Sequence, residues 1–401
     1  MNFNFHLLVI YFLSYFSILT STFFLISLLE EKRINKKIKK YPKISVLIPA
    51  HNEEENIIQT LDSIGKIDYP KKLEVIVVDD GSTDNTYKVV KKYGKKVKIY
   101  RKKQGGKASA INFGISKCKG EYIFILDADC VVEKDALKKM VKYLNEKVIA
   151  VIPSIKVLNK KNFWEKMQEI EYAIGNFSRK IIWTTSSMYI VPGAPLIKAD
   201  FLKKNKFDEG NLTEDLEMGF KILSKGYEIA HATEAIVYTR VPNSFKKLMS
   251  QRIRWSYGML YNSKKYGYLF GLRHGDLSVF VLPIVLAGIA ISCFLLIYTF
   301  SSAIYSFAKS LYYSSLIGYE VTPAMIDFQL SNLSNTFLSE ITYFSLILFI
   351  LGLTFYLITQ KSLKEKFSLH YFFYILIYGW FLIIFNFIAT LYFILGKKPK
   401  W

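Results

Sequence analysis

The sequence predicts an α/β domain with a mostly parallel, doubly wound sheet, attached to transmembrane α-helices. Between positions 41 and 267, short apolar runs rich in β-branched residues alternate with segments of helical character. This alternation is typical of parallel strands joined by crossover helices. Long uncharged runs lie on both sides of this region, and each is long enough to cross a bilayer as a helix. We therefore expect a soluble domain at residues 41–267, interfacial helices included, with membrane segments before and after it.

The apolar runs of the α/β region mark its expected strands. They are KISVLIPA from Lys43, LEVIVVDD from Leu73, VKIY from Val97, EYIFILDAD from Glu121 and KVIAVIPS from Lys147. Helical segments are expected to begin near Glu53, Asp84, Lys107 and Glu133. Parallel sheets bind ligands beyond the carboxyl ends of their strands. Chemically active residues are therefore expected just after the apolar runs.

Residues 6–29 are predicted to form an N-terminal transmembrane helix. The run contains no charged side chain, and at ~1.5 Å per residue it can cross a hydrocarbon core of about 30 Å. A cleaved signal peptide is the weaker alternative, because the run lacks a basic start and a small-residue cleavage site. The basic sequence EKRINKKIKK follows directly, so the positive-inside rule places the α/β region in the cytoplasm.

Residues 277–396 are predicted to form a C-terminal membrane domain of three or four spans, which makes the chain a multi-pass protein of the cell membrane. Apolar runs cover Leu277–Phe300, Ile341–Thr359 and Tyr371–Leu395. After one N-terminal span, three further spans leave the tail GKKPKW outside, although its lysines favour the inside. A further short span within Ser301–Gly318 would remove this conflict, and the sequence does not decide between the two topologies.

The charge of the chain favours a lipid bilayer as partner over nucleic acid. Lys and Arg number 54 against 33 Asp and Glu, which gives a formal net charge of +21. No arginine-rich tract or base-stacking motif indicates nucleic acid, so we expect no nucleic-acid partner. Basic stretches at Glu31–Lys43 and Gln360–Lys366 adjoin apolar runs, where they can contact anionic lipid. The three cysteines show neither metal-ligand spacing nor a disulfide framework, which favours a reducing compartment.

Acidic residues follow the second and fourth predicted strands. Asp79 and Asp80 lie in VVDDGSTD, where carboxylates can accept hydrogen bonds from a nucleobase or a ribose. An ordinary turn followed by a helix cap explains the same residues. Asp127 and Asp129 lie in FILDADC, and carboxylates two positions apart can converge on one cation. Oxygen ligands suit Mg²⁺ or Mn²⁺, which would offset the charge that builds on a diphosphate leaving group.

Basic residues in two further motifs suit a substrate that carries phosphate. In GGKASAIN, the glycines let a ligand approach the backbone, and Lys107 adds a point charge for phosphate. In MSQRIRWSYG, Gln251 and Arg254 can clamp a diphosphate, and Trp255 offers a stacking face for a sugar. The alternatives are a glycine turn with a solvated lysine and an interfacial helix with a snorkelling arginine.

The motif LTEDLEMG supplies a candidate general base. A sugar hydroxyl is a poor nucleophile until its proton is removed, so a positioned carboxylate is required. Asp215 is the candidate for this role. Acidic residues in the first turn of a helix explain the same composition, and the two interpretations are compatible.

Together these motifs resemble those of the GT-A glycosyltransferases of family 2, most closely the membrane synthases of hyaluronan, cellulose and poly-N-acetylglucosamine. The matching segments, in order over residues 49–255, are PAHNE, VVDDGS, GGKASAIN, DAD, TED and QRIRW. Each motif is weak alone, but six in order, each at the expected end of a strand or helix, are specific. His51 departs from the family pattern, which often has tyrosine there. The resemblance implies a GT-A fold, which is Rossmann-like with a mostly parallel sheet.

The resemblance also implies a role for each matching residue. The donor would be bound by Glu53, Asp79, Asp80, Lys107, Asp127, Gln251 and Arg254. The metal ligand would be Asp129, and the catalytic base of an inverting displacement would be Asp215. Residues that contact the acceptor would be Trp255, Glu214 and, in the segment PGAP, Gly193.

The expected reaction is the inverting, metal-dependent transfer of a sugar from a nucleoside-diphosphate sugar, UDP-linked, to a growing polysaccharide at the cytoplasmic membrane face. The expected cofactor is Mg²⁺ or Mn²⁺, and the expected partners are the nucleotide-sugar donor, a carbohydrate or lipid-linked acceptor, and the bilayer. Transfer of a single sugar to a lipid acceptor is the alternative, which the size of the product would distinguish. An inactive binding protein is less well supported, because Asp129, Asp215 and Arg254 are all present. A transporter is less well supported because few ionisable residues lie in the apolar runs.

Overall fold

The structure is a computed structural model that describes residues 5–27, 38, 40–94, 96–271, 276–316, 340–363 and 367–399. The chain divides into two compact units. The first, here called the α/β unit, comprises residues 31–286 and 368–401 and contains the sheet. The second, here called the helical unit, comprises residues 1–30 and 287–367.

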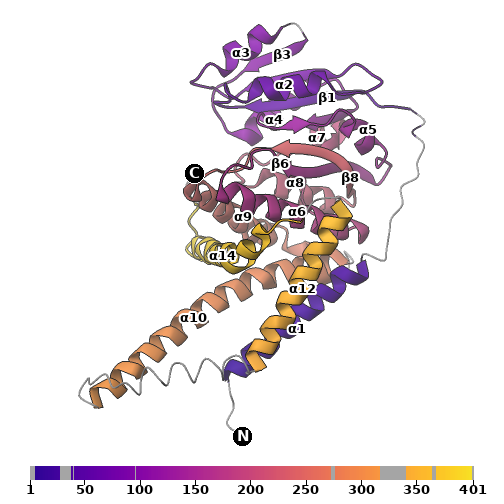
Figure 1. Cartoon of the computed structure of the whole chain (residues 1–401). Coiled ribbons are helices and arrows are strands. Elements are labelled where there is room, and N and C mark those ends of the chain that lie inside the picture. The colour runs from indigo at the N-terminus through magenta and orange to yellow at the C-terminus, as the bar shows by residue number, and fades with distance from the viewer. Residues whose placement is uncertain are drawn as a thin grey trace. The chain divides into compact units, whose positions relative to one another are not determined.

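The α/β unit is built on an eight-stranded sheet with the order β3-β2-β1-β4-β7-β6-β8-β5 (Figure 1). Its strands are β1 (Ile44–Ala50), β2 (Glu74–Asp79), β3 (Val97–Arg101), β4 (Tyr122–Ile125), β5 (Val131–Val132), β6 (Val148–Val157), β7 (Leu196–Lys198) and β8 (Glu228–Thr239). Strands β1 to β4 are parallel to their neighbours in that group, and β6 is parallel to β8. Strand β7 runs antiparallel between β4 and β6, and β5 is antiparallel to β8. The predicted α/β fold is therefore confirmed, with a mixed sheet whose first four strands have the predicted parallel arrangement.

Helices connect these strands much as the sequence predicts. The helices of the α/β unit are α2 (Ile57–Gly65), α3 (Thr86–Tyr93), α4 (Lys107–Ile115), α5 (Ala136–Val141), α6 (Phe163–Thr184), α7 (Ala199–Lys204), α8 (Glu214–Ser224), α9 (Phe245–Lys265), the short η1 (Gly267–Leu269) and η3 (Leu277–Val281), α13 (His370–Phe373), η4 (Tyr374–Tyr378) and α14 (Gly379–Ile394). Helix α4 begins at its predicted residue, and α2, α3 and α5 begin two to four residues after theirs.

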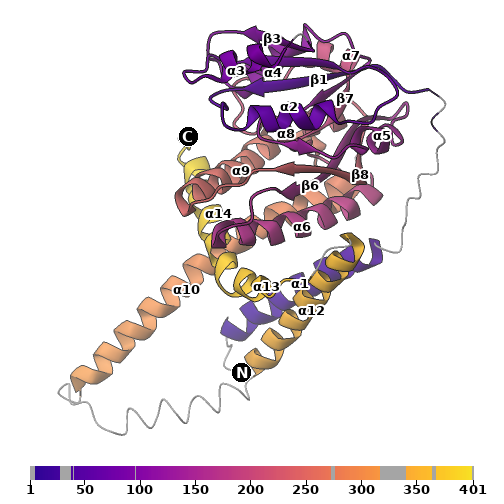
Figure 2. The ribbon, with the colours of Figure 1, turned by 45° about the horizontal axis from the view of Figure 1, so that its top comes forward.

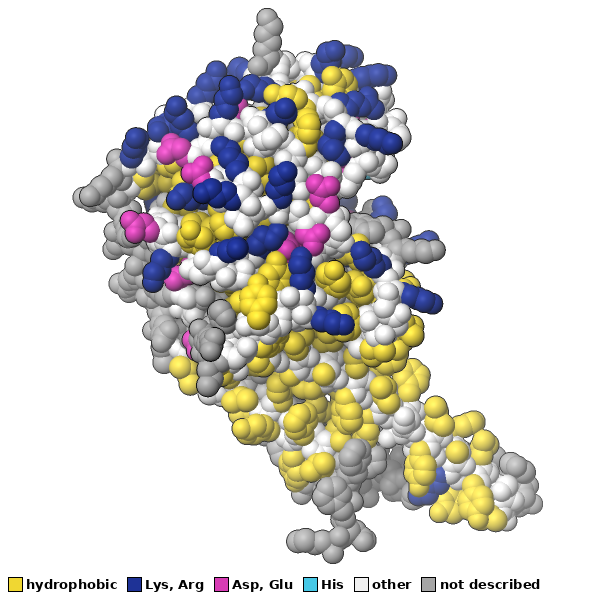
Figure 3. All heavy atoms as spheres, turned by 180° about the vertical axis from the view of Figure 1, so that it is seen from behind, with side chains coloured by type: hydrophobic (Ala, Val, Ile, Leu, Met, Phe, Trp, Pro, Cys, Tyr) yellow, Lys and Arg dark blue, Asp and Glu magenta, His cyan; other side chains and the backbone are white. Residues whose placement is uncertain are grey.

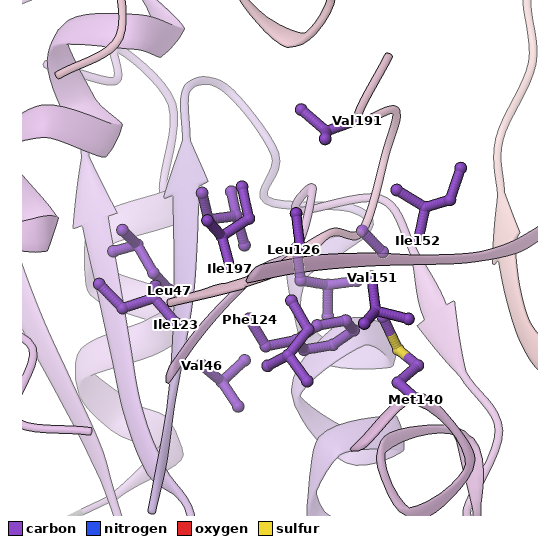
Figure 4. Close-up of a cluster of buried hydrophobic side chains, with 14 of the residues drawn as sticks. Val46, Leu47, Ile123, Phe124, Leu126, Met140, Val151, Ile152, Val191 and Ile197 are labelled. Carbon is purple, nitrogen blue, oxygen red and sulfur yellow. The ribbon is translucent and has the colours of Figure 1, made fainter. Parts of the chain in front are cut away.

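The core lies where helices cover both faces of the sheet. All seven residues of β1 are buried, which accounts for its unbroken apolar sequence. Figure 4 shows part of this core, in which residues of β1, β4, β6 and β7 pack with Met140 of α5. The residues labelled there are Val46, Leu47, Ile123, Phe124, Leu126, Met140, Val151, Ile152, Val191 and Ile197. This packing fixes the strand ends from which the candidate site is built.

Helices α6, α9 and α14 form a second layer of the α/β unit. Helix α6 packs along β6 and β8 (Figure 2) and begins with a capping box between Asn162 and Glu165. Helix α9 lies beside α14, and the Ser256 hydroxyl donates a hydrogen bond to Asn386 at 2.7 Å. The C-terminal helix is thus part of the same compact unit as the sheet.

The helical unit contains α1 (Phe5–Ser27), most of α10 (Leu282–Leu316) and α12 (Glu340–Leu363). Within the described residues, two stretches are long and apolar enough to cross a membrane, namely Leu277–Leu316 and His370–Ile394. Positions 301–316 continue α10 without a break, so they do not form a separate short span. Residues 28–29, 317–339 and 364–366 of the predicted membrane segments lie outside the described residues.

Charged and hydrophobic side chains are exposed on different parts of the chain. On the face shown in Figure 3, Lys and Arg side chains are scattered over the α/β unit, whereas hydrophobic side chains gather over the long apolar helices. On α10, Phe300, Ile304 and Tyr305 are each more than 60% exposed. Apolar side chains exposed along one helix are typical of a surface that contacts lipid or another protein.

The contact between α9 and the start of α8 leads to a first prediction. A Cβ atom at Gly258 of α9 would lie 2.2 Å from Oγ1 and 2.8 Å from Cβ of Thr213. Gly258→Ala should therefore push α9 away and lower the free energy of unfolding by roughly 1–3 kcal/mol, as overpacking usually does. Gly267→Ala is the matched control, because nothing lies within 4 Å of its added Cβ. Thermal unfolding of the two purified variants measures the difference, and equal melting temperatures would contradict the close approach.

Candidate active site

The predicted site residues come from the ends of neighbouring parallel strands. In the sheet order, β2 and β3 lie on one side of β1 and β4 lies on the other. Ligands of open α/β sheets bind beyond the carboxyl ends of the strands at such a change of direction. Glu53 follows β1, and Asp127 and Asp129 follow β4, so these carboxylates lie at that edge.

Asp80 organises the glycine loop before α4. Its carboxylate accepts hydrogen bonds from the backbone N–H groups of Gly105 at 3.1 Å and Gly106 at 2.7 Å, and from Lys102 Nζ at 2.7 Å. Gly106 has a φ of +89°, which favours glycine. Asp79 is fully buried and accepts a hydrogen bond from the turn that follows it. Asp79 thus binds the turn that follows it and Asp80 binds the loop before α4, and the contact of either carboxylate with a nucleotide stays a prediction.

Lys107 connects the end of β4 with the start of α8. It is the first residue of α4, and its Nζ lies 2.6 Å from Asp127 Oδ1 and 3.4 Å from Glu214 Oε1. Desolvation opposes the positive charge, but the two carboxylates outweigh it and raise the pKa of Lys107. The side chain is still 43% exposed, so the ammonium can also reach a bound phosphate.

A cluster suited to a metal ion lies beside this lysine. Ligand atoms of Asp127, Asp129 and Cys130 all lie within 4.8 Å of one another. Burial raises the pKa of Asp129 to about 7, with further contributions from the negative charges of Asp127 and Glu53. The spacing of the cysteines in the sequence did not predict Cys130 at this position.

The donor set of this cluster fits a hard divalent cation. Two carboxylates supply oxygen ligands, which Mg²⁺ and Mn²⁺ prefer. The Cys130 thiol donates to Asp129 Oδ1 at 3.5 Å, and burial raises its pKa well above the usual value, so it acts here as a neutral donor. Because Lys107 already pairs with Asp127, Asp129 is the carboxylate better placed to hold a cation.

Asp215 lies in the first turn of α8, close to the charges of the site. Its Oδ1 accepts a hydrogen bond from the backbone N–H of Leu216 at 2.8 Å, and the N-cap residue of α8 makes no side-chain cap bond. Burial and the neighbouring Glu214 raise the pKa of Asp215 to about 6, against the opposing influence of Lys107 and Arg254. A carboxylate with this pKa is ionised at neutral pH and basic enough to take a proton.

Helix α9 brings the QRIRW motif to the same place. Arg254 Nη1 donates a hydrogen bond to the carbonyl of Leu212 at 2.8 Å, immediately before α8. The close approach rests on Gly258, which contacts Thr213, and on Asn262, whose Nδ2 donates to Thr213 Oγ1 at 3.0 Å. Arg254 is therefore held beside the start of α8, as a diphosphate clamp would require.

The segment PGAP lies beside the candidate base. The backbone N–H of Val191 donates to the carbonyl of Asp215 at 3.3 Å, and Gly193 follows with a φ of +65°. A Cβ at Gly193 would lie 3.1 Å from Ile155 Cδ1, so glycine is favoured by both space and backbone conformation. This loop can therefore form one wall of an acceptor site next to Asp215.

Sequence reasoning missed one buried network in α9. Arg252 is only 4% exposed and forms a two-pronged ion pair with Glu171 of α6. Gln251 Oε1 accepts a hydrogen bond from the same guanidinium, so the predicted donor contact of Gln251 stays untested. Two signals could have found the network, namely the additional arginine in QRIRW and an acidic residue in the amphipathic sequence of α6.

The structure thus brings most of the predicted site residues together. The convergent group is Lys107, Asp127, Asp129, Glu214, Asp215 and Arg254. Glu53 contributes charge to it, and burial raises the Glu53 pKa. Asp79 and Asp80 have other partners, because Asp79 Oδ2 lies 3.1 Å from Arg101 Nε in a fully buried position and Asp80 binds the loop before α4. Gln251 and Trp255 both contact Arg252 instead.

Part of the chain matches a known protein family. Residues 45–205 match the family described as glycosyl transferase family 2. The poly-β-1,6-N-acetyl-D-glucosamine synthase of Staphylococcus epidermidis is 32% identical over 274 residues, which cover 64% of this chain and 65% of that protein. The synthase of the same name from Staphylococcus aureus is 30% identical over 272 residues, with the same coverage. The chain thus matches slightly less than two thirds of the length of these relatives.

A solved structure has the same fold. It is the mannosyltransferase PcManGT from Pyrobaculum calidifontis in complex with GDP-Man and Mn²⁺, with a TM-score of 0.57 and 21% identity. The superposition covers 96% of this chain and all of that one. At this identity the likeness concerns the fold, which is GT-A-like. The chain therefore contains a glycosyl transferase family 2 domain, and residues 45–205 lie within it.

Proposed function

We propose that the chain catalyses the inverting, metal-dependent transfer of a sugar from a UDP-linked donor to a growing polysaccharide. The observation that carries the proposal is the convergence of three groups at one sheet edge. They are a carboxylate pair suited to a divalent cation, two cations suited to a diphosphate, and the candidate base Asp215. The names of the staphylococcal relatives support N-acetylglucosamine as the sugar.

Each side chain has a task in the proposed displacement. Lys107 and Arg254 bind the diphosphate and offset the negative charge that it gains as its bond to the sugar breaks. Asp129 would hold a divalent cation, which would supply further charge compensation to the same leaving group. Asp215 accepts the proton of the acceptor hydroxyl while the hydroxyl oxygen bonds to the anomeric carbon. Attack from the face opposite to the leaving diphosphate inverts the anomeric configuration.

The membrane arrangement is also a proposal. Lys398 Nζ donates a hydrogen bond to the carbonyl of Gly210 at 3.2 Å, which supports a C-terminal tail on the same side as the active site. Helix α14 packs on α9, while Leu376, Trp380 and Leu391 of the preceding turn and of α14 are exposed. We infer that α14 lies at the membrane interface rather than crossing the bilayer.

This topology removes the conflict that the sequence leaves open. If α14 does not cross, α10 and the two spans that the sequence predicts at residues 6–29 and 341–359 remain, and the third of these three returns the chain to the side of the α/β unit. The positive-inside rule, applied to the basic sequence after α1, makes this side the cytoplasm. Both the candidate active site and the tail then face the compartment in which nucleotide sugars are made.

A prediction for the base concerns Asp215→Asn. The amide preserves size but cannot take a proton, so transfer should fall by roughly 10²–10⁴ while donor binding changes little. The wild-type rate should rise with pH through about 6, because only the ionised Asp215 can act and its pKa is raised to about 6. Rates and donor affinity of the purified variant measure this effect.

The matched control for the base is Asp200→Asn, an exposed acid in the first turn of α7. It should leave the transfer rate unchanged. Near-normal turnover in Asp215→Asn would mean that another group is the base. An equal loss of donor binding would make Asp215 a donor or structural residue instead.

A prediction for the metal concerns Asp129→Ala. Loss of this ligand should abolish transfer and weaken Mn²⁺ binding, measured by electron paramagnetic resonance in the presence of UDP, while the melting temperature stays close to that of the wild type. EDTA should abolish wild-type transfer, and added Mg²⁺ or Mn²⁺ should restore it. Full activity in EDTA, or unchanged Mn²⁺ binding in the variant, would contradict the proposed site.

A prediction for topology concerns single introduced cysteines. In intact cells, an impermeant thiol reagent should label Ser331→Cys, which lies between α10 and α12 in the sequence, but not Lys398→Cys. Permeabilised cells should be labelled at both positions. Labelling of Lys398→Cys from outside would show that α14 crosses the membrane.

A further inference from the structure

A hydrogen-bonded network links the C-terminal segment to helix α9 through α6. The Tyr378 hydroxyl of η4 donates to Glu171 Oε2 at 2.7 Å. Arg252 Nε and Nη2 donate to the two oxygens of the same carboxylate at 2.9 and 2.7 Å. All three side chains belong to the α/β unit, although Glu171 and Tyr378 are 207 positions apart in the chain.

The network ends on the indole of Trp255. Residues three apart share one face of a helix, and the Arg252 guanidinium carbon lies 4.2 Å from the centre of the Trp255 ring. The two-pronged bond to Glu171 fixes the plane of the guanidinium, and a fixed plane in turn limits the tilt of the ring stacked on it. Because the guanidinium covers one face of the indole, only the other face is left for a sugar.

Stability alone gives a weak account of this arrangement. Arg252 is 4% exposed, and the desolvation of a buried ion pair offsets most of its Coulomb attraction. An apolar pair of similar volume would serve packing as well. A planar, two-pronged contact is instead suited to holding one orientation, because a displaced partner would leave a buried charge unpaired.

We propose that Tyr378, Glu171 and Arg252 set the orientation of Trp255, so that the C-terminal helical segment controls acceptor binding. The three residues are positioning residues, since they act through Trp255. The inference rests on the proposed function, in which Trp255 stacks on the acceptor sugar. It adds that a residue outside the sequence motifs of the family determines acceptor affinity and product length.

The test replaces the residue farthest from the reacting atoms. Tyr378→Phe removes one hydrogen bond and keeps the ring. It should raise the KM for N-acetylglucosamine oligomers by roughly three- to tenfold, which is the usual net effect of losing one hydrogen bond. The product should also become shorter, whereas the KM for UDP-N-acetylglucosamine and its hydrolysis without acceptor should not change. Tyr392→Phe makes the same change on α14 at a tyrosine that takes no part in this network, so it is the matched control and should behave as the wild type.

A second variant separates positioning from a merely structural role. Arg252→Lys keeps the charge beside Glu171 but loses both the fork and the flat stacking surface. Positioning predicts a near-normal melting temperature together with the raised acceptor KM of Tyr378→Phe. If Arg252 has only a structural role, Arg252→Lys should keep both the stability and the activity of the wild type. Any loss of activity should then affect donor and acceptor kinetics equally.

The outcomes distinguish this inference from the proposed function. A wild-type protein that transfers no sugar from UDP-N-acetylglucosamine would overturn the proposed function. An active wild type with equal acceptor KM in Tyr378→Phe and Tyr392→Phe would overturn the inference alone. The double variant Tyr378→Phe/Trp255→Ala should bind the acceptor no more weakly than Trp255→Ala, because the proposed effect of Tyr378 on the acceptor acts through Trp255. If the two substitutions instead weaken acceptor binding additively, Tyr378 does not act through Trp255.

Discussion

Carboxylates gathered at one edge of the sheet repel one another, and Lys107 is the charge that offsets this repulsion. Its ammonium lies 2.6 Å from Asp127 and 3.4 Å from Glu214, so it joins the end of β4 to the start of α8. The position of Lys107 depends in turn on Asp80, which holds the loop before α4 through two backbone N–H groups. The metal cluster and the candidate base are near each other because this one cation bridges them.

The sequence predicts best those features that depend on local pattern. Strands β1, β2 and β4 are apolar because helices cover both faces, and the carboxylates at their ends follow from that pattern. Strand β7 has only three residues, too few for any periodicity, and its antiparallel direction depends on pairing with β4 and β6. Residue type alone also could not show that Asp80 binds the loop before α4, because this depends on the backbone path of residues 25 positions away.

The C-terminal helix shows why composition does not determine surroundings. Helix α14 is apolar enough to cross a bilayer, yet one side of it packs on α9 and Phe385 and Ala389 are buried there. A bilayer and a protein surface favour the same apolar residues, so the sequence could not distinguish them. The contacts that favour the protein surface are two hydrogen bonds, those of Tyr378 and Asn386. They join segments that are too distant in the chain for a sequence pattern to predict the contact.

The proposed reaction is a direct displacement at the anomeric carbon, in which Asp215 removes the proton and no second carboxylate acts as nucleophile. The stereochemistry of the product tests this most directly. Proton NMR of the glycan made from α-linked UDP-N-acetylglucosamine reports the configuration of each new bond through its anomeric coupling constant. Direct displacement predicts β-linkages throughout. A product with α-linkages would contradict it, because retention requires a different arrangement of groups around the sugar.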